Sequence, residues 1–268
     1  MYSVKNIIQD YNSVVKVIDK DASKQNNRAY GGVIRSVKGK LQEHITEEII
    51  KIAWNNLNGN QNRLEINSDK IKLPIKESYI KNIKNEEVRK YITNNKKYYY
   101  YGLSVDKHVF IDNKFVIGIE CKAYTENAMI KRILIDFHSL KTIFPNISCY
   151  LFKLESQLGG DYSELPETIY GSKSTHSIMS YFEYVDLNII TLLKGERNIN
   201  KPIHKNFKPL EENILNKIIK LMENELKKYF CLITDFALRP LYNCRPSPTV
   251  NFSLAWDCHG IFNACNED

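Results

Sequence analysis

Long apolar runs are absent from this chain of 268 residues. No stretch approaches the roughly 20 consecutive apolar residues that a membrane-spanning helix needs. The first residues, MYSVKNIIQDYNS, lack the apolar core of a secretory signal peptide. The six cysteines do not have the compact spacing of a disulfide framework. These absences argue against a membrane-spanning or disulfide-stapled secreted protein and predict an intracellular, cytoplasmic protein with reduced thiols.

The charge of the chain is weighted towards lysine and arginine. These number 38 against 31 acidic residues, which gives a formal net charge of +7 and an isoelectric point near 8.9. Such a balance favours a polyanionic partner, although a basic solvated surface explains it equally well. The shares of hydrophobic and charged residues, 43% and 26%, are ordinary for a globular protein, and no internal repeat is visible.

Helical spacing of apolar residues is clear near both ends of the chain. It predicts helices over residues 1–20, 40–57 and 211–230, with a polar loop, KQNNRAYGG, at 24–32. A short helix is expected near 83–92. The segment NNKKYYYYG at 94–102 is expected to be a loop or an edge strand crowded with tyrosine.

The middle of the chain predicts a β-hairpin followed by a helix and a further strand. Two apolar runs, HVFI and FVIGIE, are separated by Asp112, Asn113 and Lys114, residues that suit a tight turn. A helix up to Pro145 follows, with Thr125 as its expected N-cap, and then a strand over 146–155. This order predicts an α/β fold with a central mixed β-sheet flanked by helices.

Three charged residues flank this hairpin and suggest chemistry. Glu120 and Lys122 are two residues apart on one strand, so their side chains point to the same face. Asp106 and Glu120 are equidistant from residue 113, so a tight turn there places them opposite each other, with Cβ atoms about 5 Å apart. Two carboxylates that close need a cation between them, and Mg²⁺ suits a site with few protein ligands and several waters. Lysine on the same face can orient or deprotonate an attacking water, and it can stabilise developing charge at phosphorus.

Asp106, then Glu120-Cys121-Lys122 after a hairpin, followed by a helix, resembles the PD-(D/E)XK nuclease superfamily, with Val105 in place of the proline of its name. A chain of this length with long polar insertions looks like a type II restriction endonuclease. The resemblance implies a Mg²⁺-dependent enzyme that cleaves double-stranded DNA, with Asp106 and Glu120 binding the metal and Lys122 acting on the attacking water. A palindromic target would favour a homodimer. The alternatives are a repair, recombination or transposition nuclease, and a non-catalytic DNA-binding module on the same fold.

The resemblance also implies a helix before the motif that lends a further acid to the metal site. The helix over 40–57 offers Glu43, Glu47 and Glu48. Helical periodicity favours Glu48 as the inward residue, whereas the pattern KGKLQE, with Gly39 leading into Glu43, looks more like the family's arrangement. We take Glu43 first and Glu48 second, and three solvated helix charges remain an alternative.

Other basic residues are candidates for DNA contact. The polar insertion at 158–177 is expected to lie against the duplex, with Lys173 as its phosphate contact. Lys131 and Arg132 follow the motif on the next helix. Arg197 lies in a basic segment at 194–210 that also contains Lys194, Lys201 and Lys205. Each of these has a plain alternative as a solvated surface charge. Asp112 is expected to form the turn, Cys121 to lie in the core, and His138 to be an ordinary helix residue.

The last segment differs in composition from the rest. From residue 231 to 268 there is no lysine, and four of the six cysteines lie there. We therefore expect a nuclease domain with DNA-recognition insertions over 1–230 and a C-terminal extension of uncertain role over 231–268. The cysteines lack the paired spacing of a zinc site, so a structural extension or a changed reading frame is the better explanation.

Overall fold

The computed structural model of this protein describes residues 2–22, 27–159, 172–198, 200, 203 and 205–230. The chain divides into two units, Met1–Cys231 and Leu232–Asp268, and the described residues all belong to the first. The predicted extension at 231–268 and its cysteines lie outside the described residues. So do most of the insertion at 158–177 and Lys201.

The described residues build a five-stranded mixed sheet. Its strands lie in the order β1 (Leu64–Asn67), β4 (Lys107–Ile111), β5 (Lys114–Thr125), β6 (Ser148–Ser156) and β7 (Leu187–Thr191). The pairs β1–β4 and β4–β5 are antiparallel, whereas β5–β6 and β6–β7 are parallel. The helix between β5 and β6 provides the crossover that a parallel pair needs. The predicted α/β class with a mixed sheet is confirmed.

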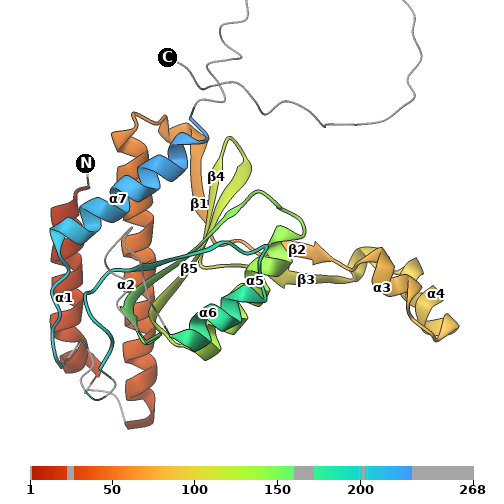
Figure 1. The fold of residues 1–268 in the computed structure, drawn as a ribbon, viewed down its shortest axis with the longest axis horizontal. Helices are drawn as coiled ribbons and strands as arrows, with labels where there is room; N and C mark the ends of the chain where they lie inside the picture. Colours follow the sequence, from red (N-terminus) through yellow and green to blue (C-terminus); the bar gives the residue numbers. More distant parts are fainter. Residues whose placement is uncertain are drawn as a thin grey trace, which may run out of the picture. The chain divides into compact units, whose positions relative to one another are not determined.

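Helices cover both faces of this sheet (Figure 1). On one face lie α1 (Val4–Ala22), α2 (Asn27–Asn56) and α7 (Glu212–Lys227), and on the other α5 (Asn127–Lys141) and α6 (Lys173–Ser180). The larger core packs Tyr11, Ile49 and Trp54 of the first group against Ile117 and Phe152 of the sheet. Each face of the sheet therefore has its own apolar core, and β5 runs between them. The described helices include none that is long and apolar enough to cross a membrane.

Helix α2 is longer than the sequence predicts. The loop predicted at 24–32 is wrong from Asn27 onwards, because α2 begins there and continues through Gly32 and Gly39. Ile34, Val33 and Val37 pack with Ile18 of α1 in a small apolar cluster. This tertiary contact outweighs the poor helix propensity of the glycines.

Helix α5 also differs at its ends. Thr125 is the last residue of β5 rather than the N-cap, which is Glu126, and the helix ends at Lys141 rather than near Pro145. Thr125 pairs with Ser156 of β6, and its carbonyl accepts a hydrogen bond from the Gln157 N–H at 3.0 Å. The parallel ladder thus extends β5 beyond the point where the helix pattern starts.

A separate ribbon projects from the sheet. Strands β2 (Ile71–Pro74) and β3 (Tyr100–Leu103) pair with each other and form their own two-stranded sheet. Between them lie α3 (Glu77–Lys81), α4 (Glu86–Asn94) and the 3₁₀ turn η2 (Lys96–Tyr98). We call residues 71–103 the arm; Figure 1 shows it extending away from α1 and α7. The short helix predicted here is confirmed as α4, and the segment predicted as a loop or an edge strand consists of η2 followed by the strand β3.

Candidate active site

The register of the β4–β5 hairpin decides which residues meet at its open end. Asp112 and Asn113 form a two-residue turn with φ angles of 51° and 61°, the left-handed conformation that such turns require. From Ile111↔Lys114 the pairing continues through Phe110↔Phe115, and then shifts to Val109↔Ile117. Val116 is therefore an extra residue, a β-bulge in β5. Beyond it, Lys107 pairs with Ile119, so Asp106 stands opposite Glu120, as predicted.

Asp106, Glu120 and Lys122 form one contact group. The Lys122 Nζ lies 3.1 Å from Asp106 Oδ2 and 2.5 Å from Glu120 Oε1. Asp106 Oδ2 also accepts a hydrogen bond from the Cys121 N–H at 2.7 Å. The side chains are 30%, 15% and 30% exposed for Asp106, Glu120 and Lys122, respectively. The group is thus shielded by the sheet but open to one side, where a substrate can approach.

Burial and charge set the protonation of this group. Burial raises the pKa of Glu120, and the negative charge of Asp106 adds to that rise against the opposing pull of Lys122. Burial by itself would lower the pKa of Lys122, but the attraction of Glu120 and Asp106 outweighs it and raises the pKa. Lys122 is therefore held as an ammonium ion between two carboxylates.

The donor set fits one cation. A single ammonium nitrogen reaches oxygens of both Asp106 and Glu120, so a carboxylate just before β4 and one within β5 converge on one position. Among the described residues no group of three or more His, Cys, Asp and Glu side chains is arranged to hold a metal ion. Two carboxylates would suit Mg²⁺, which takes few protein ligands and keeps several waters, better than a metal that needs a full protein cage.

Of the helix acids, Glu43 lies close enough to this group for its charge to interact with Asp106 and Lys122. Burial raises the pKa of Glu43, and the nearby charge of Asp106 raises it further, while Lys107 and Lys122 oppose the rise. Glu48 instead forms an ion pair with Lys51 at 2.9 Å. Glu47 pairs with both Lys51 and Lys107, each at 2.8 Å. The electrostatic neighbourhood therefore favours Glu43 over Glu48.

Two further residues near the group carry no signal in the sequence. Asp136 of α5 lies close enough to Lys122 and Glu120 for their charges to interact, and it pairs with Arg132 at 3.8 Å. Lys153 of β6 pairs in register with Lys122 and is completely buried. Asp136 and Lys153 come near the group only because α5 and β6 pack beside β5. The local spacing of residues does not reveal that packing.

The predicted DNA-contact residues are spread over several elements. Lys131 and Arg132 lie on the exposed side of α5, and Lys173 is the exposed first residue of α6. Arg197 stacks over the Tyr124 ring at 3.6 Å and donates to Gln157 Oε1 at 2.8 Å. Arg197 thus lies beside the end of β5, where Tyr124 follows Lys122 by two residues.

Three residues set aside from the sequence have ordinary structural surroundings. Asp112 lies in the hairpin turn and forms two hydrogen bonds with the Arg63 guanidinium, at 2.8 and 2.9 Å, which lowers the pKa of Asp112. Cys121 is buried against Thr46. His138 is exposed on α5, with its ring edge against Phe182.

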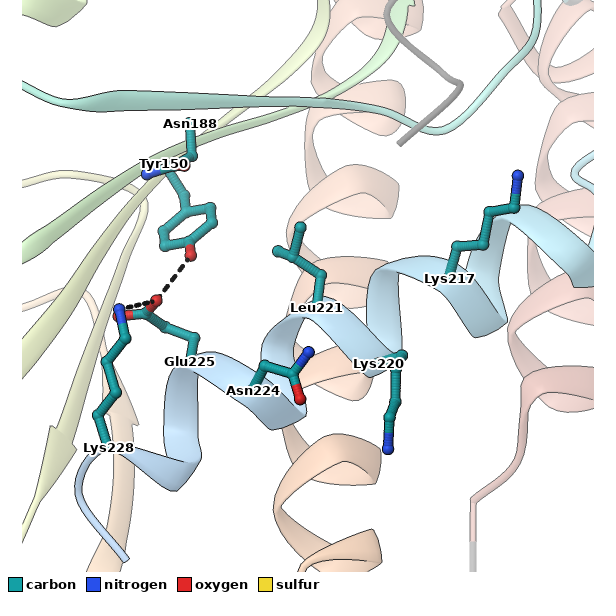
Figure 2. A pocket seen from close by; sticks show the side chains of 8 residues that line it. All are labelled: Tyr150, Asn188, Lys217, Lys220, Leu221, Asn224, Glu225 and Lys228. Atoms are coloured by element: carbon teal, nitrogen blue, oxygen red, sulfur yellow. Dashed lines mark hydrogen bonds and ion pairs between the residues drawn. The ribbon is translucent and has the colours of Figure 1, made fainter. Parts of the chain in front are cut away.

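A hollow of about 570 Å³ lies elsewhere, between α7 and strands β6 and β7. Figure 2 shows the Tyr150 hydroxyl donating to Glu225, whose carboxylate also pairs with Lys228. The Glu225 oxygens are thus already used, and no residue of the Asp106 group lines this hollow. The hollow offers no convergent reactive groups.

Comparison with known proteins supports a nuclease. Protein-family profiles gave no match. The chain is 54% identical over 231 residues to the type II restriction enzyme DdeI of Desulfomicrobium norvegicum, an alignment that covers 84% of this chain and 96% of that enzyme. This sets aside the repair-type nuclease and the non-catalytic module. Identity at this level over nearly the whole relative shows that this chain belongs to the type II restriction enzymes, which are sequence-specific endodeoxyribonucleases.

Proposed function

We propose that this restriction endonuclease is a member of the PD-(D/E)XK superfamily and hydrolyses DNA with Mg²⁺ at the Asp106–Glu120–Lys122 group. The supporting observation is the single ammonium nitrogen within 3.1 Å of carboxylate oxygens from both sides of the hairpin. Asp106 and Glu120 would hold the ion, with Glu43 of α2 as a further acid. A bound Mg²⁺ would supply Lewis acidity at the phosphate and favour ionisation of a bound water.

The chain's own residues account for the remaining steps. A water oxygen forms a bond to phosphorus and gives up a proton to solvent, while the bond to the 3′ oxygen breaks and that oxygen takes up a proton from solvent. The products are a 5′ phosphate and a 3′ hydroxyl. Lys122, kept protonated by its neighbours, donates to the attacking water or to a phosphate oxygen and offsets the developing charge. Its raised pKa argues that it orients and stabilises rather than acting as a free base.

The proposal extends to the assembly and its DNA contacts. Two-fold symmetric recognition sequences are matched by a two-fold protein, so a homodimer in the cytoplasm is the expected form. Lys131, Arg132, Lys173 and Arg197 would contact phosphates, and residues 231–268 would form an extension outside the nuclease domain.

Plasmid cleavage tests the proposal. Purified protein should linearise or fragment plasmid DNA at discrete sites with Mg²⁺ and leave it intact with EDTA. The Glu120→Gln variant keeps the shape of the side chain but removes its charge, so it should fail to cleave under the same conditions. Discrete cleavage that persists in EDTA would contradict the metal assignment, and cleavage by Glu120→Gln at the wild-type rate would contradict the site.

A further inference from the structure

The arm, residues 71–103, has an unusual charge for its size. It contains eight lysine and arginine residues against three acidic ones, a net charge of +5, whereas the whole chain carries +7. The other 235 residues together therefore carry +2. About an eighth of the chain holds most of its excess positive charge.

Most of these cations face solvent without an acidic partner among the described residues. Lys96 pairs with Glu77, and Arg89 pairs with Glu86 at 3.5 Å. Two lysines lie over tyrosine rings of the arm, Lys72 over Tyr100 at 4.8 Å and Lys97 over Tyr98 at 4.9 Å. The exposed lysines for which the structure gives no ion pair are Lys72, Lys76, Lys81, Lys84, Lys90 and Lys97. The charge is thus available to a partner.

The arm also exposes large side chains that a free surface element has little reason to show. Its exposed tyrosines are Tyr79, Tyr91, Tyr98, Tyr100 and Tyr101, at 49–67% exposure. Ile80 is the one buried residue of α3, and α4 has none. Tyrosine offers an apolar ring and a hydroxyl donor, and it is favoured where a protein meets a partner. The arm therefore has the surface of a binding element rather than of a core element.

The base of the arm adjoins the active site. β3 ends at Leu103, and Asp106 follows three residues later, a stretch of at most about 10 Å. This connection is fixed, because Leu103 and Val105 are buried and the Val105 N–H donates to the buried His108 Nε2 at 3.2 Å. A duplex with its scissile phosphate at Asp106 therefore lies beside the base of the arm.

The charge favours a polyanion over a second copy of this chain. Two copies of the arm would repel each other, and the other 235 residues carry a net charge of +2 rather than a negative one. Duplex DNA carries one negative charge per roughly 1.7 Å of its axis. Exposed lysines that form no ion pair with the described residues, together with exposed tyrosine hydroxyls, suit such a partner.

We propose that the arm binds the phosphate backbone of the duplex beside the cleavage site, through its exposed lysines and tyrosines, without reading the sequence. This inference rests on the proposed active site for the position of the scissile phosphate. Backbone binding by the arm would position the duplex and raise its affinity for any sequence.

Matched charge-removal variants test the inference. The arm variant is Lys81→Gln, Lys84→Gln and Lys90→Gln combined. The control combines Lys5→Gln, Lys217→Gln and Lys227→Gln, three exposed lysines on α1 and α7, which Figure 1 places away from the arm. Binding of a fluorescein-labelled duplex of random sequence is measured by anisotropy in EDTA over a salt series. Sedimentation velocity gives the oligomeric state, and plasmid cleavage by the wild type with Mg²⁺ is measured alongside.

The arm variant should bind more weakly, and its slope of log affinity against log salt should be smaller by about 2 to 3, since each lost phosphate contact contributes about 0.9. The control should keep a slope closer to that of the wild type. Equal slopes for the arm variant and the control would overturn the inference. A changed oligomeric state with an unchanged slope would also overturn it and assign the arm to a second copy of the chain. DNA binding is measured without metal, so it does not depend on the proposed active site. If the wild type failed to cleave plasmid DNA with Mg²⁺, that result would count against the proposed active site and not against the arm.

Discussion

Asp106 faces Glu120 because β5 has one residue more than β4 between the turn and the open end of the hairpin. That residue is Val116, which lies between the Phe110↔Phe115 and Val109↔Ile117 pairs. Without the bulge, the register would move by one residue, and a one-residue slip turns a side chain to the opposite face of the sheet. Ile119, which belongs to the core on the α2 side, would then take the place of Glu120. The bulge therefore determines which residue faces Asp106 at the proposed active site.

Replacement of Lys122 should separate its charge from its position. Lys122→Ala should slow single-turnover cleavage roughly 10²- to 10³-fold, because a donor aimed at the developing charge is lost. Lys122→Arg keeps the charge but brings a planar group that does not fit the same contacts, so it should be severely impaired too. DNA affinity measured in EDTA should change little in both. An arginine variant that cleaves at nearly the wild-type rate would show that charge alone suffices.

The two helix acids should differ in their effect on cleavage. Glu43→Gln should reduce cleavage at limiting Mg²⁺ and be partly rescued at higher concentration, because Glu43 interacts with the Asp106 group. Glu48→Gln should leave the Mg²⁺ dependence unchanged, because its contact is with Lys51. A titration of cleavage rate against Mg²⁺ measures both variants. The reverse pattern would assign the further acid of the metal site to Glu48, the residue that helical periodicity favours.

Lys153 should make stability depend on pH. Burial lowers the pKa of the Lys153 ammonium to about 7 in the folded protein, against about 10.4 in an unfolded chain. Between these values the unfolded chain binds a proton that the folded chain lacks, so stability rises with pH and is lost as pH falls towards 7. Lys153→Met removes this penalty. The free energy of unfolding of Lys153→Met should exceed that of the wild type most near pH 7. This difference should shrink by about 1 kcal/mol per pH unit between pH 7 and pH 9.5.

Urea unfolding of Lys153→Met and the wild type at several pH values measures this difference. Lys217→Met is the matched control, because Lys217 is exposed on α7. The control should show a difference from the wild type that does not vary with pH. A pH-independent difference for Lys153→Met would contradict the lowered pKa.

Two glycines should respond to alanine in opposite directions. A Cβ atom on Gly118 would lie 2.9 Å from Cε1 of the buried Phe137, so Gly118→Ala should destabilise the protein by about 1–3 kcal/mol. A Cβ atom on Gly39 would meet nothing within 4 Å, and this position is helical. Gly39→Ala should therefore stabilise by about 0.5–1 kcal/mol. Denaturant midpoints compare them, and a destabilising Gly39→Ala would show that α2 needs glycine there.

The sequence predicted the elements whose cause is local. The Asp112–Asn113 turn, the strand pattern around it and the amphipathic α7 all follow from residue type and spacing, and each is confirmed. The predicted placement of Asp106 opposite Glu120 is also correct, but it depends in addition on a feature that the sequence does not predict. A two-residue turn centres the hairpin between 112 and 113, and the bulge at Val116 moves the centre to 113. Nothing in the residues FVIG marks that bulge.

What the sequence did not predict depends on distant contacts. The early start of α2 follows from packing of Ile34 near Ile18, and the longer β5 follows from its ladder with β6. Asp136 and Lys153 come near the active group only through the packing of α5 and β6 against β5. The sequence predicts the tyrosine-rich segment as a loop or an edge strand, but its position in the arm follows from the pairing of β2 with β3.

Cleavage by Asp106→Ala, compared with Asp112→Ala, tests the active-site assignment most directly. Both changes remove one carboxylate from the same hairpin, but Asp106 contacts Lys122, whereas Asp112 pairs with Arg63 in the turn. Single-turnover cleavage of plasmid DNA with Mg²⁺ should be abolished in Asp106→Ala, with DNA affinity in EDTA largely kept, and should stay near the wild-type rate in Asp112→Ala. Near-normal cleavage by Asp106→Ala together with loss of cleavage in Asp112→Ala would contradict the assignment and place the metal at the turn.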